Sequence, residues 1–179
     1  MSKTSKKRPK EAGLPPGTLI YTGEEKEEKP RITILDYDEK KYEEKKVEKV
    51  EECFPFKDKP TTTWINIDGI HEIELIEKIG KNFNLHPLLL EDILNVGQRQ
   101  KIEDYENHIF AVLKMFQYNE NNEELAEEQI SLIIGENYVI SFQEKQGDVF
   151  EIIRERIRKA KGKIRKEGSD YLAHGLMDA

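Results

Sequence analysis

The sequence holds a single cysteine, Cys53, among its 179 residues. One thiol cannot form an intramolecular disulfide or supply a thiolate zinc site, and a lone cysteine fits a reducing cytoplasm. No window of the sequence approaches the roughly 20 consecutive apolar residues that a membrane helix requires. The sequence therefore predicts a soluble domain.

The chain also lacks an excess of basic charge. The formal net charge is -7, with 29 Lys and Arg residues against 36 Asp and Glu residues. Because a nucleic-acid binder depends on a dominant basic surface, nucleic acid is excluded as the main partner. Residues 1–13 are basic and polar, but no apolar stretch follows them as a secretion signal requires. These residues are therefore predicted to be a disordered tail.

Charged and hydrophobic residues each make up 36% of the chain. This amount of apolar residue suits one sizeable core and not two. Runs rich in Lys and Glu have two interpretations, both of which stay open. They form ion-pair networks typical of proteins from hot environments, or they form a repelling, well-solvated surface.

The apolar pattern alternates between the period of strands and the period of helices. Strands are expected at residues 18–22, 31–37, 46–50, 63–68, 108–118, 128–134 and 137–143. Helices are expected at residues 72–83 and 148–161, and from Pro87 onward in the stretch 86–96. Strands between helices, without an internal repeat, predict an α/β fold. We expect a mixed sheet covered by helices on both faces, an α/β/α sandwich.

The domain is expected to span residues 14–166, and residues 167–179 to begin a further helix. Ser169 suits a helix cap and Asp170 suits a first helical turn. The pattern then stops without a Gly, a Pro or a basic closing turn. We therefore expect residues 167–179 to be the truncated start of a long helix, and the chain to be a fragment of a longer protein.

The stretch HPLLLEDILNV, residues 86–96, carries the strongest functional signal. One arc of its predicted helix is apolar and consists of Leu89, Leu90, Ile93 and Leu94. The opposite arc consists of Glu91, Asp92 and Asn95 around a lone Leu88. Such an arc is either a solvated surface with one stray apolar residue or a surface that meets an ion or a partner.

Four segments together resemble a known family. They are LPPGTLIYTG (14–23), TWINIDGIH (63–71), HPLLLEDILNVGQRQKIEDYENHIFAVLKMF (86–116) and FQEKQGDVFEIIRERIR (142–158). In order and spacing they resemble the amino-terminal cytoplasmic domain of CorA-type magnesium and cobalt channels. The family's Gly-Met-Asn pore signature is absent from this sequence. The resemblance therefore implies the regulatory part of such a channel, at the cytoplasmic face of the cell membrane and without its stalk and transmembrane helices.

The resemblance also implies a site and partners. In a pentamer of identical subunits, Mg²⁺ ions bridge neighbours and hold the pore shut, and Co²⁺ or other divalent cations can substitute. Asp92 is the implied bridging ligand, with Glu91 and Asp178 contributing to a second ion. A further ligand is implied on the stalk helix beyond residue 179. Carboxylates suit Mg²⁺ because the ion keeps most of its water and is held by few protein oxygens.

Three residues are weaker candidates for a metal or interface role. His174 precedes Asp178 by four positions, so the two share a helix face that can hold a metal. Asn95 and Leu88 flank the acidic pair on the same arc of the helix. We expect these three residues to supply contacts to an ion or to a neighbouring subunit.

Two alternatives remain open. A zinc transporter of the ZntB type is expected to share the fold, and sequence outside this chain would decide between the two. A metal-dependent hydrolase using His86, Glu91 and Asp92 is the alternative from another class. The sequence holds no nucleophile–base set and no glycine-rich phosphate loop, so no enzymatic activity is expected.

Overall fold

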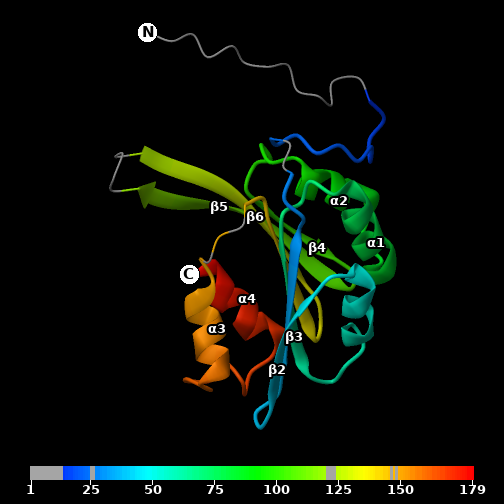
Figure 1. The fold of residues 1–179 in the computed structure, drawn as a ribbon. Helices are drawn as coiled ribbons and strands as arrows, with labels where there is room; N and C mark the ends of the chain where they lie inside the picture. The colour runs from blue at the N-terminus through cyan, green and yellow to red at the C-terminus, as the bar shows by residue number, and fades with distance from the viewer. Residues whose placement is uncertain (1–13, 25–26, 120–123, 146, 148) are drawn as a thin grey trace.

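The computed structural model describes residues 14–24, 27–119, 124–145, 147 and 149–179 (Figure 1). The expected tail at residues 1–13 and the expected helix start at Asp148 lie outside the described residues. The strands are β1 Arg31–Tyr37, β2 Tyr42–Val47, β3 Thr62–Asp68, β4 Lys101–Tyr105, β5 His108–Asn119, β6 Glu124–Ile134 and β7 Tyr138–Gln143. The helices are η1 Val50–Phe56, a 3-10 helix, and α1 Ile73–Phe83, α2 Pro87–Leu94, α3 Glu151–Arg158 and α4 Ser169–Met177.

The strands form one mixed sheet in the order β2-β1-β3-β7-β6-β5-β4. Neighbouring strands are antiparallel except β3 and β7, which pair in parallel with Trp64 opposite Val139. The chain between these two central strands contains α1, α2 and the antiparallel strands β4, β5 and β6. The predicted hairpin of β6 and β7 is confirmed, with Ile134 opposite Val139.

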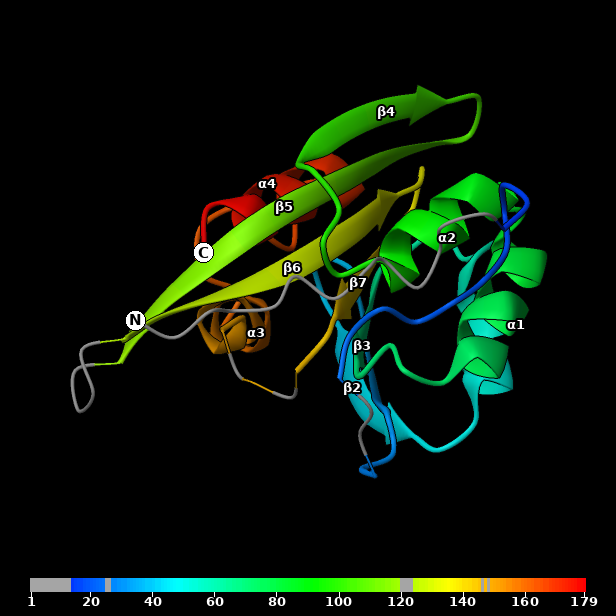
Figure 2. The ribbon, with the colours of Figure 1, turned by 90° about the horizontal axis from the view of Figure 1, so that it is seen from above.

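Helices cover both faces of this sheet, with η1, α1 and α2 on one side and α3 and α4 on the other (Figures 1 and 2). All six residues of β7 are buried because each face of this central strand meets a layer of apolar side chains. The predicted α/β/α sandwich is confirmed.

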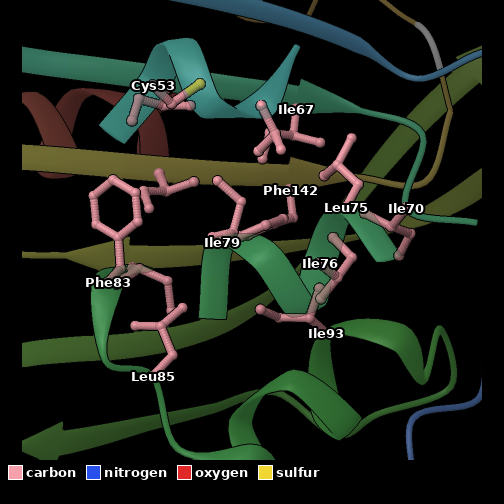
Figure 3. Packing of buried hydrophobic residues seen from close by; sticks show 14 of the residues in the cluster. Cys53, Ile67, Ile70, Leu75, Ile76, Ile79, Phe83, Leu85, Ile93 and Phe142 are labelled. Carbon is pink, nitrogen blue, oxygen red and sulfur yellow. The ribbon is translucent and has the colours of Figure 1, made fainter. Parts of the chain in front are cut away.

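The core on the α1 and α2 side joins residues that are far apart in the sequence. Figure 3 shows Cys53 of η1, Ile79 of α1, Ile93 of α2 and Phe142 of β7 in one cluster. The two helices lie close together where Gly80 faces Leu90, since a Cβ at position 80 would lie 2.3 Å from Leu90 Cδ1. Glycine at this position thus allows α2 to pack closely on α1.

The predicted strand at residues 18–22 is wrong. This segment belongs to no strand of the sheet. The backbone N–H of Thr22 donates to the carbonyl oxygen of Leu94 at 3.1 Å, and the Thr22 hydroxyl accepts from the N–H of Val96 at 3.0 Å. Thr22 therefore ties the end of this segment to the end of α2, which its β-branched residues could not indicate.

The predicted strand at residues 46–50 is only partly correct. Strand β2 runs from Tyr42 to Val47, and Val50 already begins η1. Cys53 and Phe56 follow Val50 at intervals of three and are buried with it, which is the period of a 3-10 helix. Helix α3 is also shorter than expected, because it ends at Arg158.

Ser169 does not cap α4 as predicted. It is the first residue of the helix, after Gly168, and its side chain makes no capping hydrogen bond. The buried Ser169 hydroxyl instead lies 2.6 Å from the carbonyl oxygen of Gly135 and 2.8 Å from that of Glu136, to which it donates. Ser169 therefore ties the start of α4 to the turn between β6 and β7.

Candidate metal-binding face

Helix α2 presents the predicted acidic arc because its other arc is held in the core. Leu89, Leu90, Ile93 and Leu94 are all buried, as the sequence predicted. His86 precedes the helix, and its Nδ1 accepts a hydrogen bond from the N–H of Leu88 at 3.2 Å. The side chain of Leu88 is 44% exposed beside the two acids. His86 is thus a helix cap, and Leu88 is available at the surface.

Glu91 holds the amino-terminal segment against α2. Its Oε2 accepts a hydrogen bond from the N–H of Gly17 at 2.5 Å. Gly17 has a positive φ of 82°, and a Cβ there would lie 3.3 Å from the Cβ of Pro87, so glycine suits both the conformation and the contact. One carboxylate oxygen of Glu91 therefore serves a structural contact.

Asp92 also has partners within the chain. The ammonium of Lys101 lies 2.6 Å from Asp92 Oδ2, and the side-chain amide of Gln98 donates to Oδ1. Lys101 also lies 2.9 Å from Glu103 Oε1, so its charge is shared between two carboxylates. The Asp92 side chain is 18% exposed, which leaves it accessible only from one side.

These contacts fix the charge of Lys101. Burial alone lowers the pKa of Lys101, but the hydrogen bonds to Asp92 and Glu103 outweigh it and raise that pKa. The hydrogen bond from Lys101 lowers the pKa of Glu103. Both shifts favour the charged forms of Lys101 and Glu103, so the ammonium of Lys101 keeps its charge beside Asp92.

Asn95 has a local structural contact. Its Oδ1 accepts a hydrogen bond from the N–H of Gly97 at 3.1 Å, in the turn that follows α2. The hydroxyl of Thr22 lies 3.5 Å from the same oxygen. The amide of Asn95 thus helps to order the end of the acidic helix, next to the amino-terminal segment.

Asp178 follows α4, on the other side of the sheet from α2 (Figure 2). Its Oδ2 lies 3.4 Å from Nδ1 of His174, and both side chains are 74% exposed. Leu172, Ala173 and Leu176 pack α4 into the core of the opposite face. The fold therefore does not bring Asp178 to Asp92 within one chain.

Among residues 14–179, apart from the undescribed gaps, no group of three or more His, Cys, Asp or Glu side chains could hold a metal ion. Burial raises the pKa of the Cys53 thiol to about 12, so this group is not an available thiolate. The exposed donors are carboxylate oxygens, which hydrated Mg²⁺ prefers.

Sequence reasoning missed the partners of Asp92. Lys101 and Glu103 lie on β4, an edge strand that the sequence pattern did not predict. Its only aliphatic residue, Ile102, is 68% exposed, so the strand lacks the buried apolar alternation on which prediction relies. One weak signal of a strand was present in the sequence. Alternate residues Lys101, Glu103 and Tyr105 would share one face of a strand, because side chains alternate along it.

The hydrolase alternative gains no support from this geometry. His86 caps its own helix, Glu91 accepts from the backbone of Gly17, and Asp92 pairs with Lys101. A general base, a nucleophile and an orienting group would have to lie within hydrogen-bond reach of one another. These three side chains have separate partners instead.

The described part of the chain contains no helix that is both long enough and apolar enough to cross a membrane.

The sequence family described as CorA-like Mg²⁺ transporter protein matches residues 60–179. The chain belongs to the CorA family.

A close relative is the cobalt/magnesium transport protein CorA of Thermotoga maritima. The two are 52% identical over 167 residues, which are 93% of this chain and 47% of that protein. The chain therefore spans about half the length of this relative.

Solved structures share the fold at low sequence identity. Full-length CmaX has a TM-score of 0.64 at 16% identity, over 87% of this chain and 47% of its own. The soluble domain of CorA from Methanocaldococcus jannaschii has a TM-score of 0.56 at 14% identity, over 82% of this chain and 54% of its own. The ZntB cytoplasmic domain from Vibrio parahaemolyticus has a TM-score of 0.52 at 14% identity, over 73% and 51%.

Proposed function

We propose that this chain is the amino-terminal regulatory domain of a CorA-type channel for divalent cations, Mg²⁺ and Co²⁺. The observation that carries the proposal is the 52% identity, over 93% of the chain, to the cobalt/magnesium transport protein of T. maritima. In this proposal the domain lies at the cytoplasmic face of the membrane, and the stalk and transmembrane helices belong to the remainder of a longer subunit. In this proposal residues 14–166 form the body of the domain, and residues 167–179, whose helix α4 packs on that body, lead toward the stalk.

In the proposed mechanism Mg²⁺ bridges neighbouring subunits of a pentamer. Asp92 of one subunit is the main bridging ligand, and Glu91 and Asp178 contribute to a second ion. Support comes from the placement of α2 and α4 on opposite sides of the sheet, because acids on two surfaces can meet only between copies. His174, Asn95 and Leu88 border these acids and are proposed as contacts at the same boundary.

Regulation follows from the charges of these surfaces. When intracellular Mg²⁺ is plentiful, bound ions offset the repulsion between acidic faces and favour the closed arrangement. When Mg²⁺ is scarce, the repulsion separates the subunits and the gate relaxes. Such coupling requires that the ion bind the closed state more tightly than the open state.

Uptake by the full-length protein tests the transport function. Expressed in cells without their own magnesium uptake, the protein should restore growth at low Mg²⁺ and admit Co²⁺. Restored uptake of Zn²⁺ without Mg²⁺ would instead favour the ZntB type. The structural likeness to ZntB concerns the fold alone, and the 14% identity does not specify an ion.

A further inference from the structure

The Asp92 carboxylate already holds a cation that belongs to the chain. Lys101 Nζ lies 2.6 Å from Asp92 Oδ2, a contact distance for a charged hydrogen bond. The Lys101 side chain is only 25% exposed, and its Nζ lies 5.6 Å from the centroid of the Phe110 ring. Lys101 is therefore a half-buried, oriented group and differs from a mobile surface lysine.

Both sides of this ion pair are fixed by the fold. Lys101 lies opposite Val112 in the pairing of β4 with β5. The side-chain amide of Gln129 on β6 donates to the backbone carbonyl oxygen of Asp92 at 3.2 Å, which ties α2 to the same sheet. The distance between the ammonium and the carboxylate thus depends on the packing of α2 over the sheet.

A divalent cation and this ammonium compete for the same oxygen atoms. An ion that approaches Asp92 is repelled by the positive charge of Lys101, and it can use Oδ2 fully only when Nζ leaves. Glu103 offers the ammonium a second partner, at 2.9 Å from Nζ, and Tyr105 donates to the other oxygen of Glu103 at 3.0 Å. Lys101 can therefore release Asp92 and remain paired with Glu103.

We propose that Lys101 is an internal counter-ion of Asp92 that a divalent cation must displace. Lys101 thereby sets the magnesium concentration at which the Asp92 site fills. The inference rests on the proposed function, since it concerns the same carboxylate. It adds a regulatory residue that contributes no ligand atom. Lys101 acts by pairing with the Asp92 carboxylate that would otherwise bind the ion.

Mn²⁺ titration of the 179-residue chain tests this inference. Mn²⁺ is a paramagnetic substitute for Mg²⁺ that broadens the amide signals of residues near its site. In Lys101→Met, which keeps the apolar stem over Phe110, half-maximal broadening around Asp92 should need about tenfold less Mn²⁺ than in the wild type. Excess MgCl₂ should reverse the broadening.

The matched control is Lys159→Met. Lys159 is paired with Glu155 on α3, which covers the opposite face, so the variant loses the same charge away from the site. Its titration should match the wild type within about twofold. Lys101→Arg keeps the positive charge and can pair with carboxylates at least as well, so it should not lower the Mn²⁺ requirement. Lys101→Gln is a second uncharged variant in case Lys101→Met folds poorly, which the dispersion of the amide signals shows.

Two failures can be told apart. If Asp92→Asn abolishes the broadening but the uncharged Lys101 variants bind no more tightly than the wild type, Lys101 is only a structural partner and the inference is overturned. If broadening around α2 persists in Asp92→Asn, other groups bind the ion and the proposed Asp92 site itself fails. If no variant shows broadening even at millimolar Mn²⁺, removal of the Lys101 charge does not free Asp92 to bind an ion and the inference is overturned.

Discussion

Replacement of Trp64 with alanine is expected to destabilise the fold by about 3–5 kcal/mol. Trp64 is fully buried on β3, and its ring packs edge-on against Phe150 with the centroids 5.7 Å apart. Its indole N–H donates to the hydroxyl of Ser141 at 2.9 Å, and the guanidinium of Arg154 lies 5.2 Å from the ring. The substitution removes a large apolar volume together with these contacts, at the centre of the sheet where β3 pairs with β7.

Urea unfolding followed by far-ultraviolet circular dichroism checks this value. Fluorescence does not serve, because Trp64 is the only tryptophan of the chain. Trp64→Phe keeps an aromatic ring but loses the N–H and part of the indole volume, so it should cost less, about 1–2 kcal/mol. Equal stability of Trp64→Ala and the wild type would contradict the packing described for this face.

Two adjacent leucines of α2 are expected to respond differently to the same truncation. Leu89 is fully buried and Leu88 is 44% exposed. Leu89→Ala should lower the free energy of unfolding by about 2–5 kcal/mol, because it leaves a cavity beneath α2. Leu88→Ala should change it by no more than about 0.5 kcal/mol.

This pair separates the structural arc of α2 from its functional arc. The same urea titration measures both variants, and each serves as the control for the other. In the full-length protein Leu88→Ala is expected to act on subunit contacts and not on folding, since the residue borders the acidic pair at the surface. Equal destabilisation by the two changes would show that the orientation of α2 is wrong.

The sequence predicted the parts of the fold whose apolar residues follow a clear period. The helix of residues 72–83, the acidic helix and the hairpin of β6 and β7 all bury one side or both sides of a regular element. The strand at residues 31–37 matches β1 at both ends. Regular burial leaves a pattern in the sequence, and these elements therefore needed no tertiary information.

Polar contacts between distant parts of the chain escaped prediction. The hydrogen bonds of Thr22 to the end of α2 and of Ser169 to the β6–β7 turn join residues that are far apart in the chain. Strand β4 escaped for the related reason that its exposed Ile102 hides the period of two. Such contacts are decided by which elements become neighbours, and no local pattern records them.

The candidate site was predictable residue by residue but not as an arrangement. The acidic arc of α2 followed from helical periodicity, whereas the Lys101 contact depends on the packing of β4 beside α2. The separation of Asp92 from Asp178 by the sheet likewise required the topology. This separation supports the proposal of a site shared between subunits, which the family resemblance implies.

Magnesium-dependent protection of the full-length protein against a protease that cuts the stalk tests the shared site most directly. Asp92→Asn removes the proposed bridging charge, and Asp104→Asn removes the same charge from an exposed position on β4 as the control. If ions bridge subunits through Asp92, half-maximal protection of Asp92→Asn should need at least about tenfold more Mg²⁺ than the wild type, while Asp104→Asn should match the wild type. Protection of Asp92→Asn at the wild-type Mg²⁺ concentration would contradict the account.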